Sequence, residues 1–205
     1  MGARDGGERV RSKKTVGMLG VAALFLTLIA TSAPAGAQRQ REPSRASRAD
    51  FEGGTINLAG DWGEAQACLI WRQGGVAECF RTTEELDKRE AELAPQRRES
   101  ITRESTSRDS YSYYSSYCSS SLRLYEHSWY GGRRLSFWDR GYWQNLYNYG
   151  FEDRTSSYIV GGCSVYLAEH ADGGGWWYPG PTYPYAGEPS MQWDWHDTIS
   201  SIYIG

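Results

Sequence analysis

The chain contains 205 residues, enough for one ordinary domain or two small ones, and its formal net charge is −3. Its 15 Tyr, 9 Trp and 24 Gly stand out in a sequence of which only 40% is hydrophobic. This composition favours short strands joined by turns over a helical bundle. The net negative charge excludes a broad basic surface for nucleic acid. The sequence has no GxSxG, HExxH, Walker or CxxC motif, so we expect a protein that is not an enzyme.

Residues 1–37 have the order of a secretory signal. A basic stretch comes first, an uncharged stretch from Val16 to Thr31 follows, and Ala35-Gly36-Ala37 forms a small-residue processing site. An uncleaved anchor is the alternative, but the uncharged stretch is shorter than the roughly 20 residues of a membrane span. We therefore predict a signal peptide over 1–37, cleavage before Gln38, and a secreted protein without membrane attachment after cleavage.

The rest of the chain divides by composition into four segments. They are a flexible segment at 38–65, a small hairpin–helix unit at 66–95, a Ser/Arg/Tyr-rich linker at 96–117 and a β-rich domain at 118–205. The hairpin–helix unit is too short to bury much core, so it is expected to lean on the next domain or to persist only through a disulfide. The tyrosines of the linker have an alternative, which is to pack as an extended strand against the neighbouring domain.

Turn and capping residues indicate the structure of the hairpin–helix unit. Ala67–Trp71 and Val76–Phe80 flank a Gln-Gly-Gly turn, which predicts a hairpin. Thr82 and Glu85 resemble a capping box, which predicts a short helix over Thr83–Ala94 that the following proline stops.

The four cysteines are expected to form disulfides, because an even number in an exported chain is typical of a disulfide framework. Three connectivities are open. We predict Cys68–Cys79 and Cys118–Cys163, because the hairpin register places Cys68 opposite Cys79 and because Cys118 and Cys163 precede two similar segments.

An internal duplication occupies residues 118–205. Three landmarks recur with nearly one spacing: Leu122–His127 at Val165–His170, Gly131-Gly132 at Gly174-Gly175, and Glu152–Ser157 at His196–Ser201. Such regular recurrence indicates two copies of one structural unit. Apolar residues alternate with polar ones in each copy, which predicts about four short strands per copy. Half of this segment could not bury a core alone, so we expect an all-β, two-sheet antiparallel sandwich.

The first copy resembles a known family. The pattern Tyr125-x4-Tyr130-x-Gly132, followed by Asp-x-x-Ser-Ser and a second copy, is similar to the βγ-crystallin Greek-key domain. With the preceding cysteine and the export signal, it is similar to secreted bacterial crystallin-fold proteins, a group that includes proteinaceous metalloprotease inhibitors. The second copy departs from the pattern, because Ala168 and Gly173 stand where Tyr125 and Tyr130 stand.

The resemblance implies two calcium sites built from the Asp-x-x-Ser-Ser stretches. Calcium prefers hard oxygen ligands, which carboxylates, hydroxyls and backbone carbonyls supply. The implied ligands are the carboxylates of Asp153 and Asp197, the hydroxyls of Ser156 and Ser200, and the backbone carbonyls of Arg154, Thr198, Glu126 and Glu169. Each carboxylate is expected to reach the ion held mainly by the other copy, whereas Ser157 and Ser201 are expected to bond the turns.

Two departures keep an alternative open at these sites. The family's motif has six positions and begins one residue before each Asp-x-x-Ser-Ser stretch. Its first position, where the family has Asp or Asn, is occupied here by Glu152 and His196, and its sixth by Ser157 and Ser201. A sequence-imposed turn without calcium is therefore the competing interpretation.

Two other functions share this scaffold. Inhibition of a secreted metalloprotease would need an exposed loop, for which Gly173–Pro189 and Gly141–Gly150 are the candidates. The aromatic residues could instead form a surface that binds cell-wall glycans.

Overall fold

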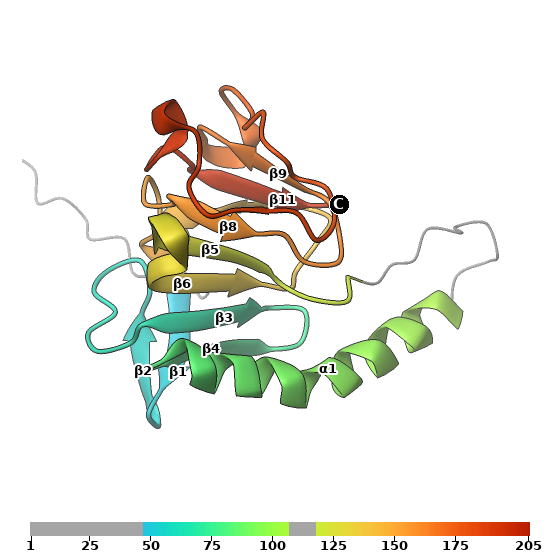
Figure 1. The fold of residues 1–205 in the computed structure, drawn as a ribbon. Helices are drawn as coiled ribbons and strands as arrows, with labels where there is room; N and C mark the ends of the chain where they lie inside the picture. The colour runs from blue at the N-terminus through green and yellow to red at the C-terminus, as the bar shows by residue number, and fades with distance from the viewer. Residues whose placement is uncertain (1–46, 107–117) are drawn as a thin grey trace, which may run out of the picture. The chain divides into compact units, whose positions relative to one another are not determined.

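The structure is a computed structural model that describes residues 47–106 and 118–205 (Figure 1). The predicted signal peptide and residues 107–117 of the predicted linker lie outside the described residues. No helix in the two described ranges is both long enough and apolar enough to cross a membrane.

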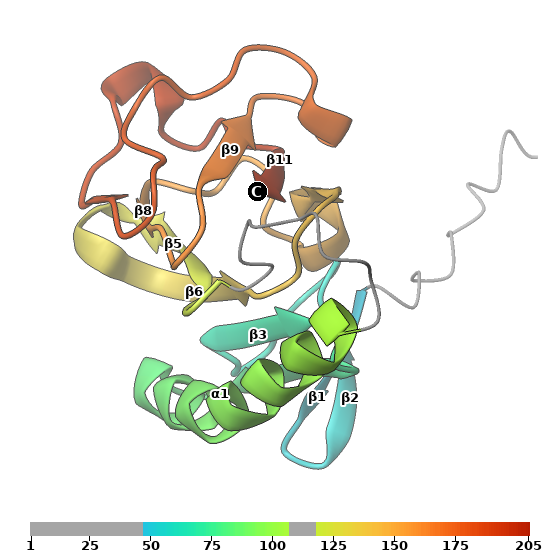
Figure 2. The same cartoon turned by 90° about the vertical axis from the view of Figure 1, so that its right-hand side faces the viewer.

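The duplicated segment folds into two facing sheets. One contains β5 (Leu122–His127), β6 (Gly131–Phe137), β8 (Ser157–Ile159) and β10 (Gly187–Glu188), and the other contains β7 (Trp143–Asn145), β9 (Val165–Ala168) and β11 (Ser201–Ile204). Figure 2 shows β9 and β11 above the layer that holds β5 and β6. Apolar side chains from both sheets, such as Leu124, Phe137, Leu167 and Ile202, are fully buried between them.

The two copies exchange strands. β7 of the first copy pairs with β11 of the second, while β10 of the second copy pairs with β8 of the first. This exchange is a Greek-key arrangement, and it confirms the predicted two-sheet antiparallel sandwich. The expectation of four strands per copy holds for the first copy only. In the second, the strand equivalent to β6 is reduced to one bridge between Ala168 and Trp177, where the chain continues into a Gly- and Pro-rich stretch.

Four further strands extend the first sheet from its β6 edge. They are β1 (Arg48–Phe51), β2 (Gly54–Asn57), β3 (Ala67–Trp71) and β4 (Val76–Phe80). Among the described residues they complete an eight-stranded sheet in the order β10-β8-β5-β6-β3-β4-β1-β2. Figure 1 shows β3 lying beside β6, with β4 on its other side. β3 pairs in parallel with β6, so backbone hydrogen bonds join the hairpin–helix unit to the repeat domain, residues 118–205.

The prediction of a flexible segment over 38–65 is wrong from Arg48 onward. Besides forming β1 and β2, this segment places Leu58 and Trp62 in the core with 0% and 1% exposure. The Trp62 indole N–H donates to the carbonyls of Leu58 and Tyr149, at 3.1 and 2.9 Å, and its ring stacks on Phe151. Tyr149 and Phe151 lie far along the chain, so local composition did not reveal them.

The hairpin and both disulfides are as predicted. Cys68 lies directly opposite Cys79 in the β3–β4 register and is bonded to it. Cys118 is bonded to Cys163, so the second bridge joins the starts of the two copies.

The helix begins as predicted but ends later. Thr82 and Glu85 exchange the hydrogen bonds of a capping box, and α1 runs over Thr83–Thr106, through Pro95, instead of ending at Ala94. A proline removes only one helical hydrogen bond, and good helix formers follow it here. Arg97, which is 4% exposed, lies over the Trp138 ring at 5.0 Å and holds this part of the helix against the sheet.

A cluster of charges also connects α1 to the repeat domain. Glu90, on the helix, accepts hydrogen bonds from Ser121 and from the Arg123 guanidinium at 2.8 and 3.0 Å. Asp87, one turn earlier, lies 2.8 Å from the Arg134 guanidinium, whose side chain is 2% exposed. The helix therefore supplies the carboxylates that a buried arginine of β6 requires.

Candidate metal centre

The two Asp-x-x-Ser-Ser loops face each other and are joined by reciprocal contacts. The Ser156 hydroxyl donates to Asp197 at 2.9 Å, and the Ser200 hydroxyl donates to Asp153 at 3.2 Å. Both aspartates have a φ of 53°, in the left-handed region. The backbone follows the same symmetry, because the N–H groups of Asp153 and Asp197 donate to carbonyls of the opposite loop at 3.1 Å each. Each carboxylate therefore meets the hydroxyl of the other copy.

The sixth-position serines hold the preceding corner, as expected. Ser157 donates to the carbonyl of His127 and Ser201 to that of His170, both at 2.6 Å. The same two hydroxyls accept from the N–H groups of Tyr130 and Gly173. They are occupied by backbone groups, which explains why they are unsuited to serve as ligands.

The eight predicted residues fall into two sets related by the duplication. Site A is defined as Glu126, Arg154, Ser156 and Asp197, and site B as Glu169, Thr198, Ser200 and Asp153. The Ser156 and Ser200 N–H groups donate to the carbonyls of Tyr125 and Ala168, the residues before Glu126 and Glu169. An open cleft of about 310 Å³ is lined by Glu126, Arg154 and Asp197 of site A, by Asp153 of site B, and by His127 and Glu152.

The sequence prediction missed an arginine clamp at site A. The Glu126 carboxylate accepts from the Arg133 guanidinium at 2.8 and 3.0 Å and from the Arg154 guanidinium at 3.0 Å. The Arg133 hydrogen bonds, above all, lower the pKa of the Glu126 carboxyl to about 2. The hairpin register around Gly131-Gly132 brings residues 126 and 133 together, so this pair was in principle visible in the sequence.

Site B carries no equivalent clamp. The second copy has Trp176 and Thr198 at the positions that Arg133 and Arg154 occupy in the first copy. The Glu169 carboxylate still accepts a backbone N–H, from Trp176 at 3.2 Å, just as Glu126 does from Arg133. The two sites therefore share a backbone but differ in charge, because two guanidinium groups border site A.

The oxygens gathered in each site are of the kind that a hard cation prefers. Each set offers one aspartate carboxylate, the hydroxyl of a serine that is 5% exposed, and nearby backbone carbonyls. These are the ligand types that calcium uses. In the described ranges no group of three or more His, Cys, Asp and Glu side chains is placed to hold a metal.

The two loops proposed for protease inhibition differ in structure. Gly141–Gly150 is not an open loop, since it contains β7 and a 3-10 turn whose Leu146 and Tyr149 are buried. Gly173–Pro189 does expose large aromatic side chains, among them Trp176 at 78% and Tyr185 at 71%. Inhibition stays a prediction.

No protein-family model matches the chain, and neither does any curated protein. Solved structures similar to it include a double mutant of a βγ-crystallin domain from Clostridium beijerinckii, with 26% identity, a TM-score of 0.35, and coverage of 41% of this chain and 94% of that one. A βγ-crystallin from Ciona intestinalis is 21% identical at a TM-score of 0.35, covering 42% of this chain and 99% of that one. The N-terminal domain of protein S is 14% identical at the same TM-score, with coverage of 42% and 96%.

The fold assignment rests on this chain's own strand pairing. Two copies of one motif exchange their third strands between facing sheets, and in each copy a serine bonds the corner of the first hairpin. Residues 118–205 therefore form a Greek-key domain of two similar motifs, as the resemblance to βγ-crystallin domains predicts.

Proposed function

We propose that the chain is a non-enzymatic protein that binds calcium at sites A and B. The observation that carries the proposal is the reciprocal pair of contacts, Ser156 with Asp197 and Ser200 with Asp153. Each contact already brings a carboxylate and a hydroxyl oxygen within 3.2 Å, so two of the required oxygens meet before any ion arrives. When bound, calcium would neutralise the carboxylate and connect the two copies at both loops.

The two sites are expected to differ in affinity. One carboxylate per site is a small charge, which places the dissociation constants near the weak end for proteins, about 10⁻⁴ to 10⁻³ M. Arg133 and Arg154 add positive charge beside site A, and like charges repel a cation. Site B is therefore the tighter of the two.

The test is calorimetric titration of calcium into chelator-treated protein, with thermal melting at increasing calcium. An ion at a hundred times its dissociation constant stabilises a protein by about 2.7 kcal/mol per site. For a cooperative unit of roughly 150 residues, this stabilisation raises the melting temperature by roughly 5 to 10 °C per site. Asp153→Asn removes the carboxylate of site B and Asp197→Asn that of site A, so each should remove one binding phase.

Asp50→Asn is the matched control, because Asp50 is an exposed aspartate of β1 that belongs to neither set. It changes the net charge equally and should leave both phases intact. A titration without heat, together with a melting temperature that stays constant up to about 100 mM calcium, a hundred times the weakest expected dissociation constant, would refute the proposal. Equal losses in the control and the two site variants would refute the assignment of the ligands.

We also propose that the chain is exported after cleavage near Ala37. Two disulfides among the described cysteines support this, since stable disulfides persist mainly in oxidising compartments. The mass of the protein recovered from a culture medium tests the proposal. Recovery of the full-length chain from the cell interior only would contradict it.

A further inference from the structure

Four aromatic rings cover the outer face of the sheet formed by β7, β11 and β9. Trp143, Tyr203 and Tyr166 are cross-strand neighbours in one row, and Trp177 stands on the edge segment beside β9. Neighbouring ring centroids lie 5.1 to 6.1 Å apart and the rings are tilted by 49° to 55°. We call these four rings the aromatic platform.

The platform is built on a glycine and remains accessible. A Cβ at Gly173 would lie 2.3 Å from the Trp143 ring, so only glycine lets this indole rest on the backbone. The Trp177 indole N–H donates to the Gly173 carbonyl at 2.9 Å, which orients the second indole. Tyr166 and Trp177 nevertheless remain 43% and 52% exposed. Pre-oriented aromatic rings that stay exposed indicate a binding surface, because apolar area in water is costly.

An uncharged groove continues the platform at Tyr166. It has a volume of about 620 Å³, and no Asp, Glu, Lys, Arg or His lines it. The lining residues are Ser164, Val165, Tyr166, Pro179, Gly180, Pro181, Thr182, Tyr183 and Gln192. The segment 179–183 is held along β9 by a hydrogen bond from the Val165 N–H to the Thr182 carbonyl, 2.9 Å long. The groove thus offers apolar walls with hydroxyl and amide groups and no formal charge.

We propose that the aromatic platform and this groove bind a neutral polysaccharide. A pyranose ring has an apolar face of C–H groups and a rim of hydroxyls. The exposed faces of Tyr166 and Trp177 match the first, and the hydroxyl and amide groups of Thr182 and Gln192 match the second. The continuity of platform and groove through Tyr166 suits a chain of sugars more than a single one. The proposal does not depend on calcium.

Charge and donor chemistry argue against other occupants. A nucleic acid or an acidic glycan needs cationic side chains for its phosphates or carboxylates, and the groove has none. A proline-rich peptide also favours aromatic grooves, but the platform would have to donate an indole N–H to the carbonyls of such a peptide. The Trp177 N–H is already donated to Gly173. A neutral, hydroxyl-rich ligand is the class that fits best.

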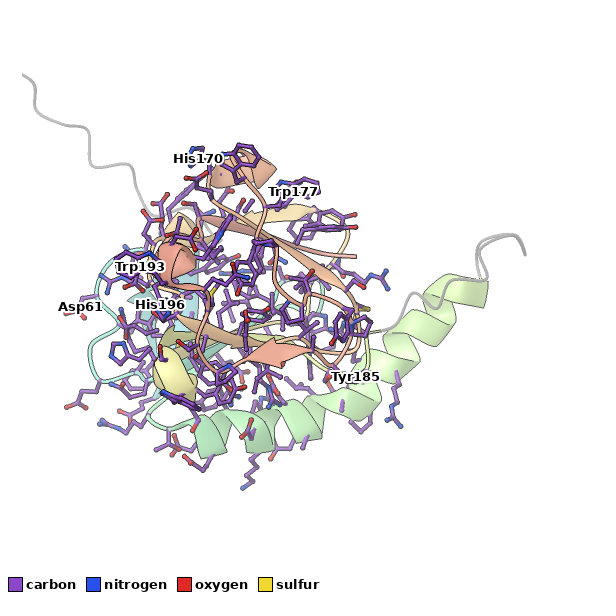
Figure 3. All side chains as sticks on the ribbon, turned by 45° about the horizontal axis from the view of Figure 1, so that its top comes forward. Asp61, His170, Trp177, Tyr185, Trp193 and His196 are labelled. Atoms are coloured by element: carbon purple, nitrogen blue, oxygen red, sulfur yellow. A yellow bond between two sulfur atoms is a disulfide. The ribbon has the colours of Figure 1, made fainter. Side chains whose placement is uncertain are left out.

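The experiment is depletion of the full chain from solution by amorphous cellulose, chitin and an insoluble β-1,3-glucan, with chelator present. We expect retention on at least one of the three. Trp177→Ala and Tyr166→Ala should each weaken it about tenfold, while Trp177→Phe should recover most of it. Trp193→Ala is the matched control. Trp193 is 92% exposed and lies apart from Trp177 in Figure 3, so its loss should leave retention unchanged. Thermal melting verifies that each variant is folded.

Four results would overturn the proposal. One is the absence of retention on all three polysaccharides. A second is an equal loss in Trp193→Ala and Trp177→Ala. A third is binding of a proline decapeptide that Trp177→Ala abolishes, without binding of any polysaccharide. The last is sedimentation showing a dimer that dissociates in Trp177→Ala, because the platform would then be an interface between two copies of this chain.

Discussion

The attachment of α1 to the repeat domain can be tested with two carboxylates of the same helix. Glu90 is 8% exposed and lies near Arg123 and Arg134, whereas Glu92 is 51% exposed and lies near Arg89, which is 32% exposed. Removing one partner of a buried ion pair costs about 3 to 5 kcal/mol, because the other charge stays buried without compensation. An exposed pair contributes about 1 kcal/mol or less. Glu90→Gln should therefore destabilise the protein by about 3 kcal/mol, and Glu92→Gln by under about 1 kcal/mol.

Urea unfolding at neutral pH, monitored by tryptophan fluorescence and by far-UV circular dichroism, measures both changes. If the helix and the sheet form one cooperative unit, the two signals coincide in every variant, since α1 and the β3–β6 junction unfold together. Equal destabilisation by Glu90→Gln and Glu92→Gln would refute the reasoning, because the two ion pairs differ mainly in burial. An early, separate loss of helical signal in the parent chain would refute the single unit.

Two further changes probe the repeat domain. The Glu126 pKa of about 2 lies below the ordinary value of 4.5, so the carboxylate's stabilisation is present above about pH 4.5 and lost as the pH falls through 2. With chelator present, Glu126→Gln should lower the free energy of unfolding by on the order of 3 kcal/mol at pH 7 and by almost nothing below pH 2. Urea titrations measure this difference, and a loss of stability that does not depend on pH would contradict the prediction. Gly150→Ala should lower the melting temperature more than Gly63→Ala. Both residues have a φ near +60°, but only at Gly150 does a Cβ meet the Leu58 carbonyl, at 2.5 Å; equal losses would contradict the predicted clash.

Patterns within short stretches of sequence predicted their own structure well. The β3–β4 register followed from one turn, and with it the bond between Cys68 and Cys79. The spacing of the duplicated segment predicted the facing loops and the pairing of Cys118 with Cys163. These features depend on turn residues and on periodicity, which are encoded locally and can be read along the chain.

Features that join distant segments did not follow from these patterns. Nothing near Trp62 in the chain shows that its partners are Tyr149 and Phe151. The sequence around Pro95 does not show that Arg97 stacks on Trp138, the contact that stabilises the helix beyond the proline. In each case the stabilising contact is more than 40 residues away, and local propensity does not contain it.

The sequence by itself determined the duplicated unit and the hairpin before it, and its resemblance to a known family implied the Greek-key topology and the eight residues of the candidate metal centre. The tertiary structure decided that the hairpin and the repeat domain share one sheet through β3 and β6. It also decided that two arginines occupy the Glu126 carboxylate, and that four aromatic rings meet on one face. The physical reason is the same throughout: a repeat or a turn is specified by neighbours in the chain, whereas charge compensation and ring packing are specified by neighbours in space.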